Sequence, residues 1–507
     1  MWPFTNAAPS APPAVTSDLV IPLSAEDDTK INRDLLLNLM LRFDVVLDPT
    51  KLTESLDKLL ARPDWRKLGA RLRQNSDVEF RKTGISSPDH FDEDRPAYTY
   101  TQLRFDVRIH EHPVASRIPS GFSGEVPANI ANPNDFNELM RDQSTPTHIN
   151  DYLTQDRPQL GLHVTSFADA TLVCISWPHT LWDAMGRREF LLAWTSLLAG
   201  REDQVLPLNG FDVTPLSEFC NDPKEEYKLL PKRLSIAQLI IFGLRLWFES
   251  FWYKEEETRV VCLPASYIQR TKAEAVASLK QAASAAGEPT DRIFLSDGDI
   301  ISAWGTKLLA EHLPFGRNQT ICLLNAFGWR ELLAPDVLPR SKAYIANASS
   351  GIFTYLRGGE VVSQPLGHSA GRVRQSIKDL GTRAQLEASV KLTRDSMRAT
   401  GHPPLYGDAT MQLVVVSNWS KAKFFEMDFS PAIVPGAPFA KGVEPVGKAS
   451  YIQVCGISGG YSLRNAFQVS GKDGQGNYWV ATTLRKHVWD SINKAWDKKE
   501  THQRVKN

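Results

Sequence analysis

The stretch TLVCISWPHTLWDAMG, residues 171–186, places a histidine and an aspartate four residues apart at the end of an apolar run. His179 follows a proline, and Asp183 opens the next segment. An imidazole with a pKa of about 6.5 can be neutral at physiological pH and accept a proton from a nearby hydroxyl. The pattern is therefore typical of a general base, although a histidine that caps the strand or packs in the core fits this context equally well.

The same spacing occurs again in SSPDHFDEDRPAY, where His90 precedes Asp94. Chance alone gives roughly 0.7 such pairs in a chain of this composition. The second pair lies in an acidic segment flanked by prolines, with no strand leading into it, and this context predicts a solvated loop. We therefore favour His179 over His90 as the base.

A third candidate is CGISGG, residues 455–460, which satisfies G-x-S-x-G around Ser458 and is followed by Asp473 and His487 in the order of α/β-hydrolases. A nucleophile elbow needs a strand that runs directly into a helix. Here the residues after Ser458 lead toward another strand. A glycine turn is the expected structure, and a serine hydrolase stays as the weaker alternative.

Composition excludes several classes of function. Lys and Arg number 58 and Asp and Glu number 58, so the net charge is zero and gives no attraction to nucleic acid. The five cysteines are far apart in sequence and form no CxxC pair, which suits a reducing compartment without structural zinc. We therefore expect a cytoplasmic protein with no metal site and no nucleic-acid partner.

Two segments bear on whether the protein contacts a membrane, namely residues 1–17 and 234–253. Residues 1–17 lack a basic region followed by an apolar one, so they predict a flexible arm and not a secretory signal. The strongest apolar run, 234–253, contains Gln238, Arg245 and Glu249, which argue against a stable membrane span. We expect a buried or interfacial helix there, and contact with a membrane surface stays open.

The elements that would position His179 follow from hydrophobic periodicity. The segment 162–179 predicts two strands joined at ADAT, and 183–200 predicts an amphipathic helix that ends at Gly200. A strand near residue 45 and a helix that follows it open the chain, with leucines on one helix face. Further strands are predicted at TRVVCLP, QTICLLNAF and MQLVVVSNW, a hairpin at NAFQVSGKDGQGNYWVATTL, and helices at SYIQRTKAEAVASLKQAASAAG, DGDIISAWGTKLLAEHL and RKHVWDSINKAW.

The length of 507 residues exceeds what one hydrophobic core usually serves, so two domains are expected. Residues 201–233 are polar and rich in proline, and we place the crossover there. The predicted organisation is α/β in two halves, 18–200 and 234–507, after the arm 1–17.

Several separate stretches are similar to characteristic segments of one family. In chain order they are IPLSAEDD, WRKLGARL, HTLWDAMG, FLSDGDIISAW, LLNAFGWRELLAPDVLPRSKAYIAN, VVVSNWSKAKFFEMDFS and GKDGQGNYWVATTL. Together they resemble the BAHD-type, CoA-dependent acyltransferases, especially the fungal branch that modifies specialised metabolites. The resemblance covers most of the chain. It implies a chloramphenicol-acetyltransferase-like fold of two related mixed-sheet domains with a tunnel at their interface.

The resemblance also implies roles for particular residues. His179 would be the general base, and Asp183 would hold Arg330 and support the fold instead of orienting the imidazole. Ser417 and Trp419 would stabilise the oxyanion or line the acyl site. Asn347, Asp428, Asp183 and Arg330 are expected as structural support.

Three departures from the family pattern affect these expectations. Glycine follows Asp183 only at Gly186, Ala346 replaces the glycine of the family's YFGN, and Asp428 is followed by FSPA where the family has FGWG. We expect an altered loop shape at the last of these, and not lost chemistry.

The function implied is transfer of an acyl group, most simply acetyl, from acyl-CoA to a hydroxyl of a specialised metabolite by a monomeric enzyme. No permanently bound cofactor is expected, and acyl-CoA is a co-substrate. Arg270 and Lys272 are possible phosphate contacts, but the CoA site is left unassigned. A condensation enzyme that uses a carrier protein, the Ser458 hydrolase and a noncatalytic member of the fold are the alternatives.

Overall fold

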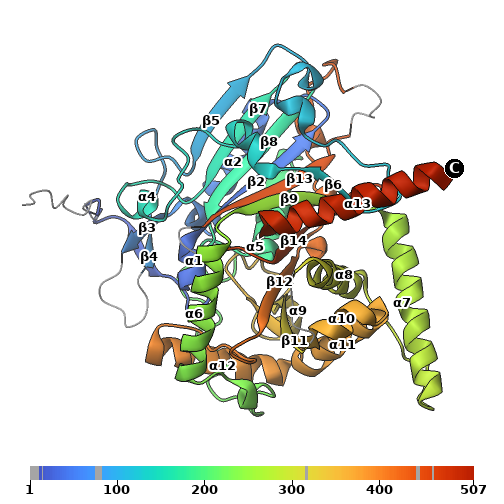
Figure 1. Ribbon diagram of the computed structural model, residues 1–507. Helices are drawn as coiled ribbons and strands as arrows, with labels where there is room; N and C mark the ends of the chain where they lie inside the picture. Colours follow the sequence, from blue (N-terminus) through green and yellow to red (C-terminus); the bar gives the residue numbers. More distant parts are fainter. Residues whose placement is uncertain are drawn as a thin grey trace, which may run out of the picture.

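The computed structural model describes residues 11–13, 15–74, 83–313, 318–440, 446–458 and 462–506. Most of the predicted arm, residues 1–10 and 14, lies outside this part of the chain. The described residues form a five-stranded sheet, a seven-stranded sheet and a small three-stranded sheet. Figure 1 shows the five-stranded sheet in the upper part of the molecule, with helices α8, α10 and α11 gathered in the lower part. The predicted α/β class is confirmed.

The five-stranded sheet carries the strand that leads to His179. Its strand order is β13 (Tyr451–Ser458), β2 (Leu35–Phe43), β8 (Thr171–Pro178), β7 (Gly161–Ser166) and β5 (Thr99–Arg104). Helices α2 (Pro49–Leu60) and α5 (Ala184–Leu198) pack against each other, and the indole of Trp194 donates to the carbonyl of Leu52 at 3.1 Å. Burial of Leu52, Leu56, Leu59 and Leu60 agrees with the helix face predicted from their spacing.

The seven-stranded sheet holds the second half of the chain. Its order is β11 (Ser349–Arg357), β10 (Thr320–Gly328), β12 (Gln412–Asn418), β14 (Ala466–Lys472), β15 (Tyr478–Arg485), β9 (Glu256–Leu263) and β6 (Ala128–Ala131). Apolar faces of the helices around it form a separate core. These helices are α7 (Ala265–Ala285), α8 (Asp297–His312), α10 (Gly358–Ser363), α11 (Leu366–Leu380) and α13 (Lys486–Lys506), with α12 (Arg383–Thr400) beyond α11.

Two strands cross between the halves of the chain. Strand β13 comes from the second half but pairs antiparallel with β2, and β6 comes from the first half but pairs with β9. The sheets are therefore tied together by exchanged strands on both sides of the crossover. Within 201–233, all of which is described, the structure has the short 3₁₀ turns Glu202–Gln204 and Leu230–Lys232 and isolated β-bridges at Leu208 and Arg233, but no α-helix or strand.

The third sheet has the order β1 (Leu19–Pro22), β4 (Thr83–Ser87) and β3 (Arg71–Gln74), and the sequence did not predict it. The remaining α-helices are α1 (Lys30–Asp34), α3 (Asn137–Met140), α4 (Asn150–Leu153), α6 (Ile236–Trp252) and α9 (Arg330–Leu333). Of the two alternatives expected for 234–253, a buried helix is excluded, because α6 forms but most of its apolar side chains are exposed. Among the described residues, no helix is long and apolar enough to cross a membrane.

Candidate active site

His179 occupies the turn between β8 and α5. Its backbone N–H donates to the carbonyl of Leu35 on the neighbouring strand at 2.9 Å. Its own carbonyl accepts the side-chain amide of Asn347 at 3.0 Å. Both ends of the residue are thus fixed by segments far away in sequence, which limits the freedom of the imidazole.

The electrostatic environment keeps this imidazole neutral. Burial lowers the pKa of His179 below its usual value, and the positive charge of Arg187 acts in the same direction. The residue's own carbonyl and the carboxylate of Asp183 oppose this shift without cancelling it. The Nδ1 atom is buried, whereas the residue as a whole keeps some accessible surface. A neutral imidazole can accept a proton, which is the first requirement for a general base.

Asp183 points its carboxylate into a set of fixed donors. One oxygen accepts the N–H of Gly186 at 2.8 Å and caps α5. The other accepts Arg330 Nη1 at 2.8 Å and the N–H of Ala348 at 3.0 Å. Burial alone would raise the pKa of Asp183, but Arg330 and these hydrogen bonds lower it below its usual value. The carboxylate is therefore ionised and held in place.

Arg330 joins this carboxylate to the segment that follows β10. Its guanidinium also donates to the carbonyl of Tyr344 at 3.2 Å and to that of Ala346 at 2.7 Å. The structure thus brings Asp183 and Arg330 together in an ion pair whose side chains are 9% and 14% exposed. The pair clamps the start of α5 to residues 344–348.

The close approach of two backbones explains why residue 186 is a glycine. A β-carbon on Gly186 would lie 1.7 Å from the carbonyl oxygen of Ile345 and 2.6 Å from its carbonyl carbon. No side chain fits between two backbones at this distance. The first turn of α5 therefore rests directly on the segment that Arg330 holds.

Asn347 connects His179 to the start of the chain. Both its backbone N–H and its side-chain amide donate to Asp27 Oδ1 at 2.8 Å. The hydroxyl of Ser24 donates to the other oxygen of Asp27 at 2.7 Å. Burial raises the pKa of Asp27 to about 6. The segment IPLSAEDD gives no local sign of this role for Asp27, because its partner is 320 residues away.

Ser417 and Trp419 lie where β12 ends, and each keeps some accessible surface. The indole N–H of Trp419 donates to the Ser417 hydroxyl oxygen at 2.8 Å. This bond leaves the hydroxyl hydrogen of Ser417 available to a further acceptor.

Arg187 links this pair to the strand that carries His179. Its guanidinium carbon lies 4.5 Å from the ring centroid of Trp419, 4.4 Å from that of Phe424 and 4.8 Å from that of Trp177. Burial lowers the pKa of Arg187 to about 9, with Asp183 acting in the opposite direction. Sequence reasoning overlooked this cation, although its spacing from Phe190 places it on the buried face of α5.

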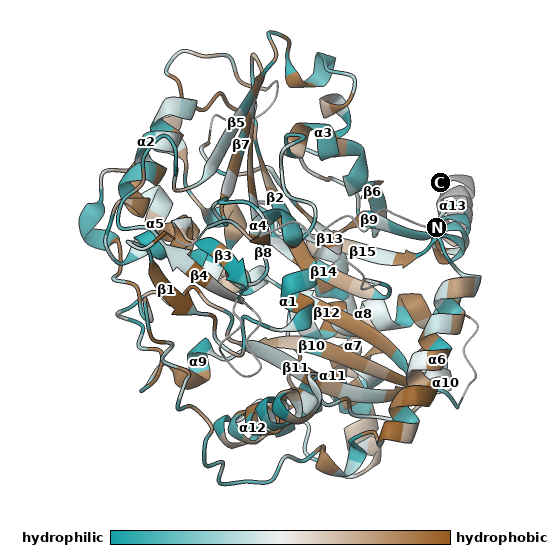
Figure 2. Ribbon diagram, turned by 90° about the vertical axis from the view of Figure 1, so that its left-hand side faces the viewer, coloured by the Kyte–Doolittle hydropathy of each residue, from teal (hydrophilic) through white to brown (hydrophobic). Residues whose placement is uncertain are grey.

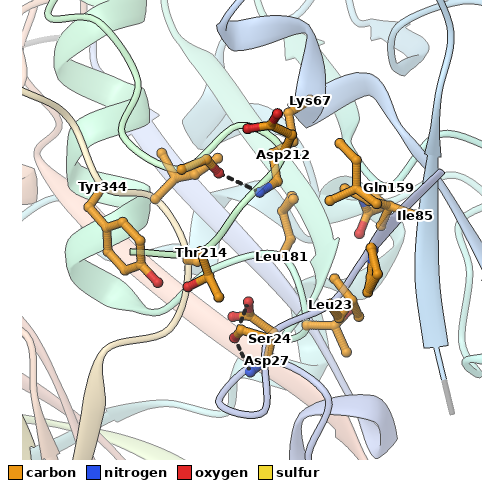
Figure 3. Close-up of a pocket in the computed structure, with 16 residues that line it drawn as sticks. Leu23, Ser24, Asp27, Lys67, Ile85, Gln159, Leu181, Asp212, Thr214 and Tyr344 are labelled. Atoms are coloured by element: carbon orange, nitrogen blue, oxygen red, sulfur yellow. Dashed lines mark hydrogen bonds between the residues drawn. The ribbon is translucent and has the colours of Figure 1, made fainter. Parts of the chain in front are cut away.

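A cavity of about 30 Å³ lies beside the His179 turn. Thr180 and Leu181 line it, together with Asp27 and Lys67. Figure 3 shows Lys67 reaching toward the segment that carries Asp212, and its ammonium donates to the carbonyl of Gly210 at 2.8 Å. The space is large enough to hold water but is too small for a metabolite.

Asp428 lies apart from these contacts in an exposed turn, where it accepts the N–H of Ser430 at 2.8 Å. The next residue, Phe429, is fully buried. Its ring centroid lies 5.1 Å from that of Phe43 and 5.3 Å from that of Trp194. The segment that departs from the family's FGWG still anchors its loop on the core through Phe429.

The residues of the proposed hydrolase do not form a triad. The backbone of Ser458 ends β13, residues 459–461 lie outside the described part of the chain, and the next regular element is strand β14. Asp473 precedes β15 and His487 follows it, so a strand of eight residues, roughly 25 Å, separates them. The carboxylate of Asp473 instead accepts the indole N–H of Trp479 at 2.9 Å.

Neither a metal site nor a CoA site can be assigned. Among the described residues, no group of three or more His, Cys, Asp or Glu side chains could hold a metal ion. Lys272 pairs with Asp297 at 2.9 Å, and the guanidinium of Arg270 lies 5.8 Å from the ring of Tyr267. These contacts give no reason to choose either cation as a phosphate ligand.

Comparison with known proteins places these contacts in context. The model of the Transferase family matches residues 128–434. Acetyltransferase adrJ of Penicillium rubens is 36% identical, with 96% of this chain and 97% of that protein covered. Transcriptional regulator calD of Penicillium decumbens is 39% identical, with 97% and 98% covered.

Solved structures show the same fold at low sequence identity. TRI101 of F. graminearum, complexed with Coenzyme A and T-2 mycotoxin, aligns with a TM-score of 0.66 and 14% identity over 95% of this chain and 98% of that chain. Vinorine synthase aligns with a TM-score of 0.59 and 13% identity over 94% and 93%. The two-domain arrangement expected from the resemblance is consistent with these neighbours.

Proposed function

We propose that this chain, which belongs to the BAHD-type Transferase family, transfers an acetyl group from acetyl-CoA to a hydroxyl of an apolar specialised metabolite. Acyl transfer in fungal secondary metabolism is supported by relatives named acetyltransferases and O-acyltransferase. The choice of acetyl rests on the names of those relatives. The choice of CoA as carrier is supported by structural neighbours that were solved with Coenzyme A.

The observation that carries the proposal is the geometry of His179. Its backbone is fixed at both ends, its pKa is lowered, and its Nδ1 atom is buried. Nε2 is then the nitrogen available to a substrate. In the proposed reaction, Nε2 accepts the proton of the acceptor hydroxyl while the hydroxyl oxygen attacks the thioester carbonyl.

The attack produces a tetrahedral oxyanion that needs preorganised donors. We assign this role to the Ser417 hydroxyl, which is already polarised by the indole N–H of Trp419. Collapse of the intermediate breaks the carbon–sulfur bond and expels the CoA thiolate. The imidazolium then returns the proton to that sulfur, so the enzyme ends in its starting state.

Asp183 has a positioning role in this scheme. Its oxygens accept Gly186, Arg330 and Ala348, and these bonds hold α5 against the segment that carries Asn347. Asn347 in turn binds the carbonyl of His179. The ion pair thus acts on the base through the backbone and does not touch the reacting atoms.

A noncatalytic role is the second candidate, because a relative that is 39% identical over nearly the whole of both chains is named a transcriptional regulator. The net charge of zero gives no support for direct binding to DNA. Retention of a neutral, positioned His179 favours catalysis over this reading.

The test is an assay for free thiol with acetyl-CoA and a panel of hydroxylated apolar metabolites. We expect thiol release that depends on the acceptor, that His179→Ala abolishes and that Ser458→Ala leaves intact. Ester cleavage that depends on Ser458, without acyl transfer, would reject the proposal. Folded protein that releases no thiol with any acceptor would favour the noncatalytic candidate.

A further inference from the structure

Helix α6 exposes apolar side chains over most of its surface. It begins at a capping box in which Ser235 and Gln238 satisfy each other's backbone N–H groups, so its start is well defined. The exposed fractions reach 79% for Ile236, 61% for Leu244, 66% for Trp247 and 67% for Trp252. Figure 2 shows α6 at the edge of the molecule, with brown hydrophobic residues along it. Monomeric proteins rarely leave an apolar patch of this extent without a function.

The few contacts between α6 and the rest of the protein come from a narrow stripe. Phe242 is buried in a small core that includes Met411. Arg245 Nη2 donates to the Met411 carbonyl at 2.6 Å, and Glu249 forms an ion pair with Arg485. Phe242, Arg245 and Glu249 are three and four residues apart, which places them on one helix face.

This arrangement reverses the usual order of a surface helix. A helix on a water-exposed surface normally buries its apolar stripe and presents its charges to solvent. In α6 the two charged residues, Arg245 and Glu249, are turned toward the protein and paired there. The outward surface is then free of charge, which suits contact with a medium less polar than water.

The shape and composition of α6 favour lipid over a protein partner. The exposed side chains surround most of the helix, so it forms a ridge and not a groove. Aromatic residues gather in its second half, where Trp247 stacks near Phe251 at 5.9 Å and Phe248 near Trp252 at 6.0 Å between ring centroids. Tryptophan rings favour the boundary between headgroups and acyl chains.

Charges beside the helix point to the same partner. The exposed ionisable side chains nearest the two ends of α6 are basic, namely Lys232 and Arg233 before it and Lys254 after it, whereas the exposed Glu225, Glu226 and Glu255 lie farther from the helix along the chain. Glu255 is paired with Lys486, and Glu249 within α6 is paired with Arg485. A bilayer that contains anionic lipid would attract these cations while it accepts the apolar side chains.

We propose that α6 binds in the plane of a bilayer that contains anionic lipids. At 17 residues the helix is about 25 Å long, and no described helix meets the requirements for a membrane span, so the chain would lie on one leaflet. The proposal does not depend on the transfer reaction, because it rests on α6 and its neighbours alone.

Flotation with lipid vesicles tests this proposal. We expect the purified full chain to float with vesicles of phosphatidylcholine and phosphatidylserine. The combined variant Ile240→Ser, Leu244→Ser and Trp247→Ser removes one outward stripe and should lower the bound fraction at least about tenfold. Its thermal stability should stay near that of the wild type, because the three side chains are exposed.

A matched control distinguishes binding through α6 from nonspecific binding through any exposed apolar side chain. Phe294 is 60% exposed but lies outside α6, so Phe294→Ser should keep full binding. Loss of binding in this control to the same extent as in the α6 variant would overturn the assignment to α6.

The contribution of the basic residues is tested with the variants Lys232→Glu and Arg233→Glu. Each should weaken binding to vesicles with phosphatidylserine about fivefold and change binding to pure phosphatidylcholine much less. Failure of the wild-type chain to float with either vesicle would overturn the proposal. Sedimentation velocity tests whether α6 binds a second copy of this chain instead of lipid. A dimer that the triple α6 variant abolishes, together with no binding of the wild type to vesicles, would identify that second copy as the partner.

Discussion

Two regions of the molecule share the HxxxD pattern and differ in almost every other respect. The side chain of His90 is 81% exposed, and its ion-pair contact is Asp92 Oδ2 at 3.7 Å. His179 has both backbone groups bonded, to Leu35 and Asn347, and its imidazole is held neutral by burial. The spacing of the two residues is the same. Strand β4 ends at Ser87, three residues before His90, so the expectation that no strand leads into that pair is wrong. Only His179 directly follows a strand and is followed by a helix.

The two aspartates extend this contrast. Asp94 is exposed in its loop, whereas Asp183 binds Gly186, Arg330 and Ala348. A short sequence pattern therefore indicates chemistry only where the fold supplies partners for its polar atoms.

The largest difference is expected between the two histidines. In the proposed mechanism, His179→Gln removes the base, and kcat should fall by about 10²- to 10⁴-fold. The paired control His90→Gln should keep wild-type kcat and KM, because that side chain is exposed. Steady-state rates and melting temperatures of both variants check this. Comparable losses in the two variants would contradict the contrast.

The next effect concerns Asp183 and Arg330. Asp183→Ala leaves Arg330 buried without its charge partner and should lower the free energy of unfolding by about 3–5 kcal/mol, together with activity. Asp94→Ala should change that free energy by less than about 0.5 kcal/mol. Urea unfolding of Asp183→Ala, Arg330→Met and the double variant measures the coupling. If the losses of unfolding free energy in the two single variants simply add up in the double variant, Asp183 and Arg330 do not stabilise each other and the proposed pair is contradicted.

A smaller effect is expected at Asn347. Asn347→Ala leaves the His179 carbonyl without its side-chain donor and removes one of the donors to the Asp27 carboxyl, while the backbone N–H of residue 347 and the Ser24 hydroxyl still bind that carboxyl. The change should cost about 1–3 kcal/mol of unfolding free energy. If Asn347 positions the base, kcat should fall more than KM changes. Asn134→Ala, at an exposed site, serves as the control. An unchanged kcat in Asn347→Ala would show that the carbonyl contact does not position His179.

The smallest effect is a pH dependence at Asp27. Its folded pKa is about 6 against 3.8 for the free side chain, so between these values the folded state binds more protons than the unfolded state. Stability should therefore fall as pH rises through this window, by at most about 1.4 kcal/mol per pH unit. Asp27→Asn should remove this part of the slope in urea unfolding measured from pH 4 to about 6. A slope identical to that of the wild type would show that Asp27 titrates normally.

The sequence predicted the local parts of this site. Strands 161–166 and 171–178 and the helix after Asp183 follow from short-range periodicity, and all three are present. Arg330 could be named as the partner of Asp183 only through the family resemblance, and the structure brings the two together.

Other parts depend on contacts between distant segments, which no local pattern encodes. The bond from Asn347 to Asp27 and the exchange of β13 into the first sheet are of this kind. The sequence also could not show whether the apolar side chains of α6 face the protein or the solvent, because hydropathy shows only that the helix is apolar. Arg187 illustrates the same limit, since its spacing from Phe190 places it on the buried face of α5 but does not show which aromatic rings surround its guanidinium.

The most direct measurement follows the acyl group itself. Acetyl-CoA with a deuterated acetyl group is incubated with hydroxylated apolar acceptors, and mass spectrometry locates the label. The account predicts label on the acceptor oxygen with the wild type and with His90→Gln, and none above background with His179→Gln at equal folded concentration. Equal labelling by His179→Gln, or labelling that requires Ser458, would contradict the role of His179 as the general base.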